Sequence, residues 1–315
     1  MKSLFFKQFS YWLKRRIVKS NPLWEINRCY KKALGVYPNL KTPKNLIEKI
    51  YWMEWNSDTS LWTKCADKYR VREFLKEQGL EHIAPKLLGI WHNVEDIDFS
   101  ELPQEFILKT NDGCGTNLIV RDKSKYDVEQ VKKLFKSFMK YKQGFSNAQY
   151  HYLEIEPCVI AEELLHQSDE LNEYSPNSLV DYKVYCFNGK PECVNVLYDR
   201  TKTSVYNRLY DLDWNEMPEK VVPYKGMRSS KSIFPKPKCL NEMLNYASIL
   251  SQPFPEVRVD FYVINDQPVF GELTLSTGYG DFTKEYYNYL GAKVDLTKVK
   301  KVSMESKLKR IKNIK

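Results

Sequence analysis

The chain has 315 residues, of which 43% are hydrophobic and 28% charged, so a sizeable packed core is available and wholesale disorder is excluded. Its seven cysteines are scattered without a CxxC pair, which argues against a disulfide framework or a zinc site and favours a reduced, cytoplasmic environment. No apolar run approaches the roughly 18 residues that a membrane-spanning helix needs.

The net charge of +9 is concentrated at the two ends of the chain. Residues 1–20 carry six Lys or Arg and no acid, and residues 298–315 carry eight against Glu305, which leaves −4 for residues 21–297. A nucleic-acid-binding protein is expected to carry its basic patch on the folded core. We therefore expect no nucleic-acid partner. The basic tail over 298–315 is either a second electrostatic contact or a frayed lysine-rich end.

Residues 1–41 are predicted to form a basic, helical, amphipathic extension. Within residues 1–20, large apolar side chains recur at helical spacing opposite a basic face. Such a helix either docks on its own domain or lies on an anionic membrane surface, and both alternatives stay open. The apolar stripe consists of Phe6, Phe9, Leu13 and Ile17, with Phe5 and Trp12 beside it.

The rest of the chain alternates between helical and strand-like segments. Residues 42–80 are predicted to be mainly helical, with Gly79 as the stop, and further helices are predicted over 127–142 and 239–250. Strand-like runs cover 86–90, 106–109, 118–120, 158–165, 182–187 and 192–197, and a final strand pair follows. The order of these elements predicts an α+β fold with antiparallel pairs rather than a regular βαβ alternation.

A glycine-bearing loop joins two of the predicted strands. Lys109 ends the first strand, and residues 112–117 (Asp-Gly-Cys-Gly-Thr-Asn) lead into the second. Glycines let backbone N–H groups approach an anion closely, and a nearby lysine adds a positive charge for phosphate. The loop has neither the P-loop pattern nor GxGxxG. An ordinary glycine hairpin with a surface lysine is the alternative interpretation.

The final strand pair carries two acids. If the hairpin turns about Asp266, Asp260 faces Glu272 and Arg258 faces Thr274, all on one face of the sheet. Two facing carboxylates repel each other unless a divalent cation lies between them, and hard oxygen ligands suit Mg²⁺. The alternative is a solvated polar face on which Arg258 bridges the two acids.

Three shorter patterns leave their alternatives open. Asp181 and Lys183 point to one face of the strand that enters the Asn188-Gly189 hairpin, as a surface ion pair or a phosphate site. The apolar strand that ends in Glu162-Glu163 is a candidate edge for a purine. Asp211-Leu212-Asp213 matches the DxD pattern that holds Mn²⁺ and a nucleotide-sugar, so a glycosyltransferase of polysaccharide biosynthesis is the alternative function.

Taken in order, these segments resemble the ATP-grasp superfamily, and most closely its branch associated with teichuronopeptide and capsular polysaccharide biosynthesis. The resemblance covers roughly residues 42–285. It implies two α+β subdomains that close over ATP: helical and N-terminal ATP-grasp parts over 42–155, and a C-terminal subdomain with the adenine hinge and metal site over 156–297. It rests on LWTKCADKYRVREFL (61–75), FILKTNDGCGTN (106–117), IAEELL (160–165), DYKVYCFNGKP (181–191), YDLDW (210–214) and VRVDFYVINDQPVFGELTLSTGYG (257–280).

The resemblance also implies roles for single residues in nucleotide binding. Lys109 would contact the α and β phosphates, and Lys183, beside Asp181, would be a second phosphate lysine. Backbone groups around Glu163 and Leu164 would receive the adenine. The loop residues that would cover the phosphates are Gly113, Gly115, Thr116 and Asn117. The acids assigned to the nucleotide are Glu162, and Glu163 or Glu170 near the ribose.

For the metal and the reaction, the resemblance implies that Asp260 and Glu272 ligate Mg²⁺. Thr274 stands where many relatives have an Asn, and its neutral oxygen is a weaker candidate ligand. Arg258 would stabilise the transferring phosphoryl group.

The implied activity is an ATP- and Mg²⁺-dependent ligation of a carboxylate to an amine. The substrate carboxylate takes the γ-phosphoryl group, and the amine then displaces phosphate from the acyl-phosphate. The resemblance further implies that the enzyme attaches an amino acid to a uronic-acid sugar of a surface polysaccharide, capsular or O-antigen. The expected location is the cytoplasm, and contact of residues 1–20 with the inner face of the membrane is one of the two alternatives left open above.

Overall fold

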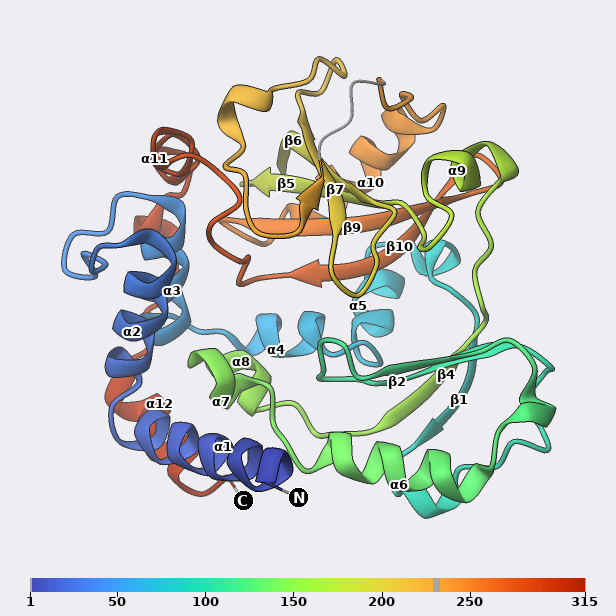
Figure 1. Cartoon of the computed structure of the whole chain (residues 1–315). Helices are drawn as coiled ribbons and strands as arrows, with labels where there is room; N and C mark the ends of the chain where they lie inside the picture. The colour runs from blue at the N-terminus through green and yellow to red at the C-terminus, as the bar shows by residue number, and fades with distance from the viewer. Residues whose placement is uncertain (1, 229–232, 315) are drawn as a thin grey trace.

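Two β-sheets frame the molecule, the four-stranded sheet below the six-stranded one in Figure 1. The computed structural model describes residues 2–228 and 233–314. All strand pairs are antiparallel except β7–β8, which is parallel. The smaller sheet has the order β1 (Leu87–Trp91), β4 (Val159–Glu162), β2 (Phe106–Thr110), β3 (Asn117–Val120). The larger has the order β10 (Gln267–Thr274), β9 (Val257–Ile264), β5 (Asp181–Phe187), β6 (Lys190–Tyr198), β7 (Val205–Tyr210), β8 (Met227–Arg228).

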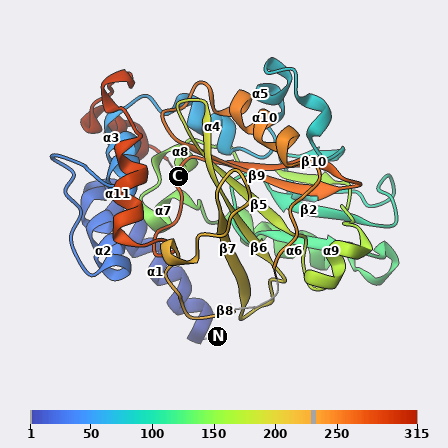
Figure 2. The same ribbon diagram turned by 90° about the horizontal axis from the view of Figure 1, so that it is seen from above.

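Helices surround the two sheets. Before the first strand come α1 (Lys2–Ser20), α2 (Pro22–Leu34), α3 (Leu46–Asn56), α4 (Ser60–Ala66) and α5 (Val71–Glu77). Later come α6 (Val128–Met139), α7 (Gly144–Asn147), α8 (Tyr150–Leu153), α9 (Asp169–Tyr174), α10 (Leu240–Ser251), α11 (Lys284–Ala292) and α12 (Met304–Lys312). Single 3₁₀ turns occupy Glu81–Ile83, Val94–Asp96, Lys123–Lys125, Pro218–Lys220 and Leu296–Lys298. Figure 2 shows α2, α3 and α11 together along one flank.

The smaller sheet has a hydrophobic core of its own. Phe106 and Leu108 of β2 are fully buried and pack with Val131 and Phe135 of α6. Alternate β2 side chains point to opposite faces, so Lys109 is turned away from this core. Helix α6 begins at its N-cap Asp127, as predicted, but ends at Met139 rather than at residue 142.

The larger sheet buries one face and leaves the other polar. Val184 and Cys186 of β5 are fully buried, and the Cys186 thiol contacts the backbone carbonyl of Ala247 in α10. The period of two along β5 therefore sends Asp181 and Lys183 to the opposite face. This alternation sets up the candidate site.

The two predicted hairpins form, with one correction. Asn188 and Gly189 both have positive φ, 51° and 79°, as the predicted two-residue turn requires. The predicted turn about Asp266 is wrong, because Ile264 pairs with Gln267 and the turn is Asn265-Asp266. Asn and Asp side chains tolerate the left-handed conformation that such a turn needs.

A β-bulge then restores the predicted pairing farther from the turn. The register shifts between Phe270 and Glu272, at Gly271. As a result Asp260 pairs with Glu272 and Arg258 with Thr274, as expected from the sequence. A bulge adds one residue to one strand, which compensates for the shorter turn.

Two segment boundaries also differ from the prediction. The strand predicted over 158–165 ends at Glu162, and residues 163–168 form no regular element. The helical region predicted over 42–80 divides into α3, α4 and α5. Gly79, with a φ of 71°, follows α5 as the predicted stop.

The chain ends lie side by side, with α12 next to α1 (Figure 1). The Arg15 guanidinium donates to the Ile314 carbonyl at 3.1 Å, and the Lys19 ammonium to the Lys312 carbonyl at 3.1 Å. The lysine-rich end is therefore not frayed: it forms a helix in which Lys307 and Ile311 are buried. No helix within residues 2–228 and 233–314 is long and apolar enough to cross a membrane.

Candidate active site

The polar face of the larger sheet gathers charged residues from β5 and β9. Lys183 pairs directly with Asp260 across the two strands, and their buried side chains form an ion pair. The Lys183 ammonium also lies 2.6 Å from the Asp181 carboxylate. The Arg258 guanidinium donates to both carboxylate oxygens of Asp260, from Nε at 2.6 Å and from Nη2 at 2.7 Å. The sequence-predicted residues Asp181, Lys183, Arg258 and Asp260 are thus brought together.

Strand β10 adds Glu272 and Thr274 to this cluster. The Arg258 Nη2 donates to the Thr274 hydroxyl at 2.9 Å, and that hydroxyl donates to Glu272 Oε1 at 3.1 Å. Arg258 also lies 3.6 Å from Glu272, so it bridges the two acids, as the alternative interpretation of the hairpin expected. The Glu272 side chain remains 43% exposed.

The protonation of the buried pair follows from its neighbours. Burial alone would raise the pKa of Asp260, but the charges of Arg258 and Lys183 hold that pKa below its ordinary value. Burial would lower the pKa of Lys183, but the carboxylates of Asp181 and Asp260 raise it. Asp260 is therefore a carboxylate and Lys183 an ammonium at neutral pH.

The oxygens in this cluster are suited to a hard cation. Asp260 and Glu272 offer carboxylates and Thr274 a neutral hydroxyl, and Mg²⁺ at nucleotide sites typically takes one or two carboxylates and fills its shell with phosphate and water oxygens. No group of three His, Cys, Asp or Glu side chains that would hold a metal alone occurs in the described part of the chain. The donor set fits a magnesium ion shared with a phosphorylated ligand.

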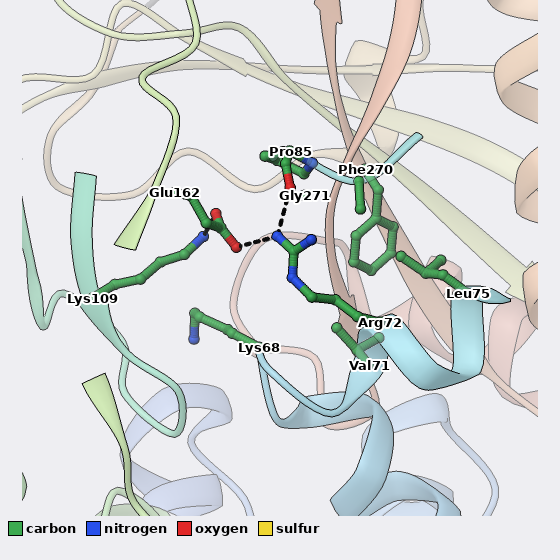
Figure 3. Close-up of a pocket in the computed structure, with 10 residues that line it drawn as sticks. Lys68, Val71, Arg72, Leu75, Pro85, Lys109, Glu162, Phe270 and Gly271 are labelled. Atoms are coloured by element: carbon green, nitrogen blue, oxygen red, sulfur yellow. Dashed lines mark hydrogen bonds and ion pairs between the residues drawn. The ribbon is translucent and has the colours of Figure 1, made fainter. Parts of the chain in front are cut away.

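A second charged cluster lies on the smaller sheet. Lys109 of β2 forms an ion pair with the buried Glu162 of β4. Arg72 of α5 donates to the same carboxylate at 2.8 Å and to the Pro85 carbonyl at 2.6 Å (Figure 3). Sequence reasoning missed Arg72, because α5 and β4 are 90 residues apart and nothing local marks this arginine.

Both sheets contribute to the pocket shown in Figure 3. Lys109 and Glu162 come from the smaller sheet, whereas Phe270 and Gly271 come from β10 of the larger one. Lys68, which also lines the pocket, donates to the Gly113 carbonyl at 2.7 Å. The pocket therefore lies where the two sheets meet the glycine loop.

The glycine loop is closed by its own threonines. The Thr110 N–H donates to the Thr116 carbonyl at 3.1 Å, and the two hydroxyls are 2.6 Å apart. A Cβ on Gly113 would lie 1.8 Å from the Thr116 hydroxyl, so only glycine fits there. Gly115 has a φ of +71°, which other residues rarely adopt. Asn117 pairs with Lys109 across β2 and β3.

Two tyrosines connect the clusters electrostatically. Burial raises the pKa of Tyr262, and so do the carboxylates of Asp260 and Glu272 on one side and Glu162 on the other. Burial also raises the pKa of Tyr152, with further contributions from Glu272 and from Cys114 in the glycine loop. The Tyr262 phenol is thus within electrostatic reach of carboxylates from both clusters.

The residues predicted to bind the adenine and the ribose, Glu163, Leu164 and Glu170, differ in their contacts. Glu163 pairs with Lys86 through its backbone N–H, at 3.0 Å, and its carboxylate, at 2.7 Å. In residues 2–228 and 233–314, no hydrogen bond engages the backbone of Leu164. Glu170 lies on α9 with its side chain exposed, and no contact joins it to either cluster within the same residues.

The carboxylate of the first Asp in the DxD segment stabilises a turn. The Asp211 carboxylate accepts from the N–H groups of Asp213, at 3.0 Å, and Asn215, at 2.8 Å, and from the Asn215 amide. These contacts occupy Asp211 in local structure, and Asp213 is exposed. The geometry gives the glycosyltransferase alternative no support.

The family follows from a comparison with known proteins. The TupA-like ATP-grasp family model matches residues 48–295, most of the chain. The chain belongs to the TupA-like ATP-grasp family. No curated protein matches its sequence.

Several solved ATP-grasp structures are similar to this TupA-like protein. The D-alanine–D-alanine ligase of Bacillus anthracis, complexed with ATP, is 17% identical with a TM-score of 0.48, and the match covers 84% of this chain and 74% of that one. An ADP complex of N5-carboxyaminoimidazole ribonucleotide synthetase is 14% identical with a TM-score of 0.44, over 71% and 48% of the two chains. The L-amino acid ligase of Bacillus licheniformis is 11% identical with a TM-score of 0.40, over 79% and 45%. This chain thus spans about half of the length of the last two.

Family membership confirms two expectations from the sequence. The fold is the α+β ATP-grasp fold, with an N-terminal helical extension. The enzyme class is that of the ATP-grasp ligases, which form C–N bonds with ATP. The roles of single residues, the division into subdomains and the substrates remain to be proposed.

Proposed function

We propose that this TupA-like enzyme is an ATP- and Mg²⁺-dependent carboxylate–amine ligase that works through an acyl-phosphate. The observation that carries the proposal is that β10, the strand that carries Glu272, lines the same pocket as Lys109 and Glu162 of the smaller sheet. We further propose that this site lies between the two subdomains expected above, 42–155 and 156–297, except that β4 belongs with the smaller sheet, where it lies between β1 and β2.

The nucleotide would lie between the two clusters. Lys109 would bind the α and β phosphates, loop 112–117 would cover them, and Lys183 would bind from the opposite sheet. Leu164 would receive the adenine, because its backbone groups have no partner in residues 2–228 and 233–314. The ribose would then fall near Glu163 or Glu170.

Asp260 and Glu272, with Thr274, would hold Mg²⁺. Bound there, the metal would neutralise phosphate charge and orient the γ-phosphoryl group. Because Arg258 already contacts all three of these side chains, its guanidinium is close enough to reach a transferring phosphoryl group. Fixed positive charges of this kind act mainly by stabilising the charge that develops in the transition state.

The reaction balances without an enzyme nucleophile. A substrate carboxylate oxygen bonds to the γ-phosphorus as the bond to ADP breaks. The amine nitrogen then bonds to the carbonyl carbon, the carbon–oxygen bond to phosphate breaks, and the amine loses a proton. Exclusion of water by the glycine loop protects the acyl-phosphate from hydrolysis.

The acceptor would bind on the same polar face, beside Lys183. Asn195 pairs directly with Lys183 across β5 and β6, and Asn207 lies on the same face of β7. Both are buried, and their side-chain oxygens have no hydrogen-bond partner in the described residues. A buried oxygen without a partner is costly, and hydroxyl or amine groups of a substrate would satisfy it.

Asp281 adds a carboxylate to this region. Burial raises the pKa of the Asp281 carboxyl above its ordinary value, despite the opposing charges of Arg258, Lys183 and Arg200. Within residues 2–228 and 233–314 its carboxylate forms no hydrogen bond or ion pair. It would bind the ammonium group of the amine substrate and take the proton that leaves before the nitrogen attacks, and the departing phosphate would take the second proton.

We also propose that the carboxylate belongs to a uronic-acid sugar of a surface polysaccharide and that the amine is an amino acid. The support is the resemblance, noted from the sequence, to a branch associated with polysaccharide biosynthesis, together with the unpartnered side-chain oxygens of Asn195 and Asn207. If this acceptor were carried on lipid at the inner face of the membrane, the enzyme would work there.

Thermal unfolding of the purified chain tests the nucleotide site first. A ligand that binds only the folded state stabilises it by about 2.7 kcal/mol at a hundredfold excess over Kd. We expect stabilisation by Mg²⁺ with ATP or ADP and none by UDP or UDP-sugars. Stabilisation by UDP-sugars alone would overturn the proposal. Phosphate release with pairs of uronic acids and amino acids then identifies the substrates.

A further inference from the structure

Exposed apolar side chains are concentrated in the first two helices and the segment after them. Of the ten large hydrophobic residues that are exposed in the described part of the chain, five lie between residues 12 and 37. Their exposed fractions are 47% for Trp12, 44% for Leu13, 49% for Trp24, 55% for Val36 and 62% for Tyr37. Single exposed apolar residues are ordinary, but a sequence-local group of this size indicates an interaction surface.

Helix α1 docks on the protein through Tyr11, Lys14 and Val18, and the side chains of Phe5, Phe6 and Phe9 of the predicted stripe lie outside the described residues. Val18 is fully buried, the Tyr11 hydroxyl accepts from the Lys142 N–H at 2.9 Å, and the Lys14 ammonium donates to the Ser146 carbonyl at 3.3 Å. The predicted docking on its own domain is therefore confirmed. Leu13, from the predicted apolar stripe, is nevertheless exposed to solvent, and so is Trp12.

The charge around these side chains has a single sign. Residues 1–44 contain eleven Lys or Arg and one acid, Glu25. Glu25 is fully buried and accepts from the Arg28 Nε at 2.7 Å, so it contributes no negative charge to the surface. Among residues 10–44, whose exposure the structure describes, the exposed basic residues are Arg16, Lys31, Lys32, Lys41 and Lys44.

Basic and aromatic groups are paired on this surface. The Arg16 guanidinium lies 4.7 Å from the centre of the Trp12 ring, and the Lys31 ammonium 4.4 Å from that of Tyr37. Aromatic rings beside long cationic side chains suit the boundary between lipid headgroups and acyl chains, because the ring enters the apolar layer while the charge stays at the phosphates.

Helices α1 and α2, which carry these side chains, are fixed to the rest of the protein. Arg15 and Lys19 of α1 donate to the carbonyls at the end of α12, as described above. Helix α2 starts at its N-cap Asn21 and ends at Gly35 in the left-handed conformation. Figure 1 shows α1 and α2 along the edge of the molecule, away from the strands that form the active site.

We propose that α1, α2 and residues 35–44 form a surface that binds anionic lipid membranes. This lipid-binding surface, defined by Trp12, Leu13, Arg16, Trp24, Lys31 and Tyr37, goes beyond the ligase activity and does not depend on it. A second copy of the chain is a poorer occupant, because a two-fold contact would bring the same positive charges together. Anionic headgroups attract every exposed cation here.

Sedimentation of the full chain with lipid vesicles tests the proposal. We expect binding to vesicles of phosphatidylcholine mixed with phosphatidylglycerol, little binding to phosphatidylcholine alone, and release by high salt, because the attraction is screened. The variant Trp24→Ser/Val36→Ser/Tyr37→Ser should bind about tenfold more weakly, since it removes the inserting side chains. Lys31→Gln/Lys32→Gln should weaken binding to the anionic vesicles only.

Leu134→Ser, at an exposed position of α6, is the matched control and should bind as the unmodified chain does. All the substitutions are at exposed positions, so an unchanged melting temperature and unchanged stabilisation by Mg²⁺–ADP will show that each variant is folded. Failure of the unmodified chain to bind anionic vesicles, or equal binding by the triple variant, would overturn the proposal. A dimer that the triple variant abolishes, without vesicle binding, would assign the surface to a second copy instead.

Discussion

Lys183 on β5 and Asp260 on β9 face each other in the sheet and form a buried ion pair, with Arg258 holding the same carboxylate from its own strand. The proposed metal ligand is thus already neutralised by two cations. Removing one partner of a buried pair destabilises the fold, because it leaves the other charge uncompensated. Asp260 therefore has a structural role as well as the proposed one, and Glu272 gives the cleaner test of metal binding.

Glu272→Gln should remove the response to magnesium and leave the fold almost unchanged. The Glu272 side chain is 43% exposed and lies 3.6 Å from Arg258, so its loss should cost less than about 1 kcal/mol of stability. The stabilisation by Mg²⁺ with ADP, measured by thermal unfolding, should fall to the level seen with ADP alone. Glu101→Gln, at an exposed acid far from the site, is the control. Full retention of the magnesium effect in Glu272→Gln would exclude this residue as a ligand.

The pairing of Asp260 with Glu272 was predictable from the sequence, but the turn and the β-bulge that produce this register were not. Period-two alternation put both acids on one face, and the hairpin was evident from the two flanking strands. The turn at Asn265-Asp266 and the bulge at Gly271 each shift the register by one, and the two shifts cancel. Neither shift alone is visible in a sequence pattern, since Asn, Asp and Gly are compatible with several turn types.

Residues that act across long sequence separations escaped prediction. Arg72 of α5 donates to Glu162 of β4. Asn195 becomes a candidate binding residue only because it pairs with Lys183 on the adjacent strand. Lys307 lies in a segment whose composition suggests a solvated end, yet it is buried. Local patterns report period and turn chemistry, whereas these positions depend on which elements pack together.

The glycine loop should not tolerate a methyl group at Gly113. A Cβ there would lie 1.8 Å from the Thr116 hydroxyl and 2.5 Å from that of Thr110, so Gly113→Ala must break the contact between the two threonines. We expect the Kd for Mg²⁺–ADP, measured by calorimetry, to rise at least about tenfold because the loop can no longer take this shape. In Gly278→Ala the added Cβ meets nothing within 4 Å, and nucleotide binding should be kept. Equal binding by the two variants would contradict the proposed role of the loop.

Arg72 and Glu162 should be energetically coupled. Their contact at 2.8 Å is largely buried, so Arg72→Met should destabilise the fold by about 3–5 kcal/mol by leaving Glu162 underpaired. The double variant Arg72→Met/Glu162→Gln should lose less unfolding free energy than the sum of the two single losses. Denaturant unfolding should give a coupling energy of about 1–3 kcal/mol. Arg72→Lys should restore only part of the loss, because the shorter lysine side chain does not bring its ammonium to the position from which Arg72 Nη2 donates to both Glu162 and the Pro85 carbonyl. Strict additivity would show that the two side chains act independently.

The docking of α12 should depend on pH through Lys307. Its ammonium donates to the Glu54 carbonyl at 2.6 Å and to the Thr59 hydroxyl at 2.8 Å, with only 2% of the residue exposed. Burial lowers the pKa of Lys307 from 10.5 to about 8, although nearby carboxylates, chiefly that of Glu54, partly offset the effect. Between these two pH values the unfolded chain binds one proton more than the folded chain. The free energy of unfolding should therefore rise with pH across this window, by up to about 1.4 kcal/mol per pH unit from this group.

Denaturant unfolding at pH 7, 8, 9 and 10 measures this dependence. The difference in stability between the unmodified chain and Lys307→Met should stay constant below about pH 8 and then grow in favour of the unmodified chain, because methionine has no proton to lose. Lys309→Met replaces a neighbouring lysine of α12 that is mostly exposed, so it should follow the unmodified chain at every pH. Parallel curves for the unmodified chain and Lys307→Met would show that the Lys307 ammonium keeps its proton in the folded state up to the ordinary pKa of lysine, and that the contacts with Glu54 and Thr59 outweigh its burial.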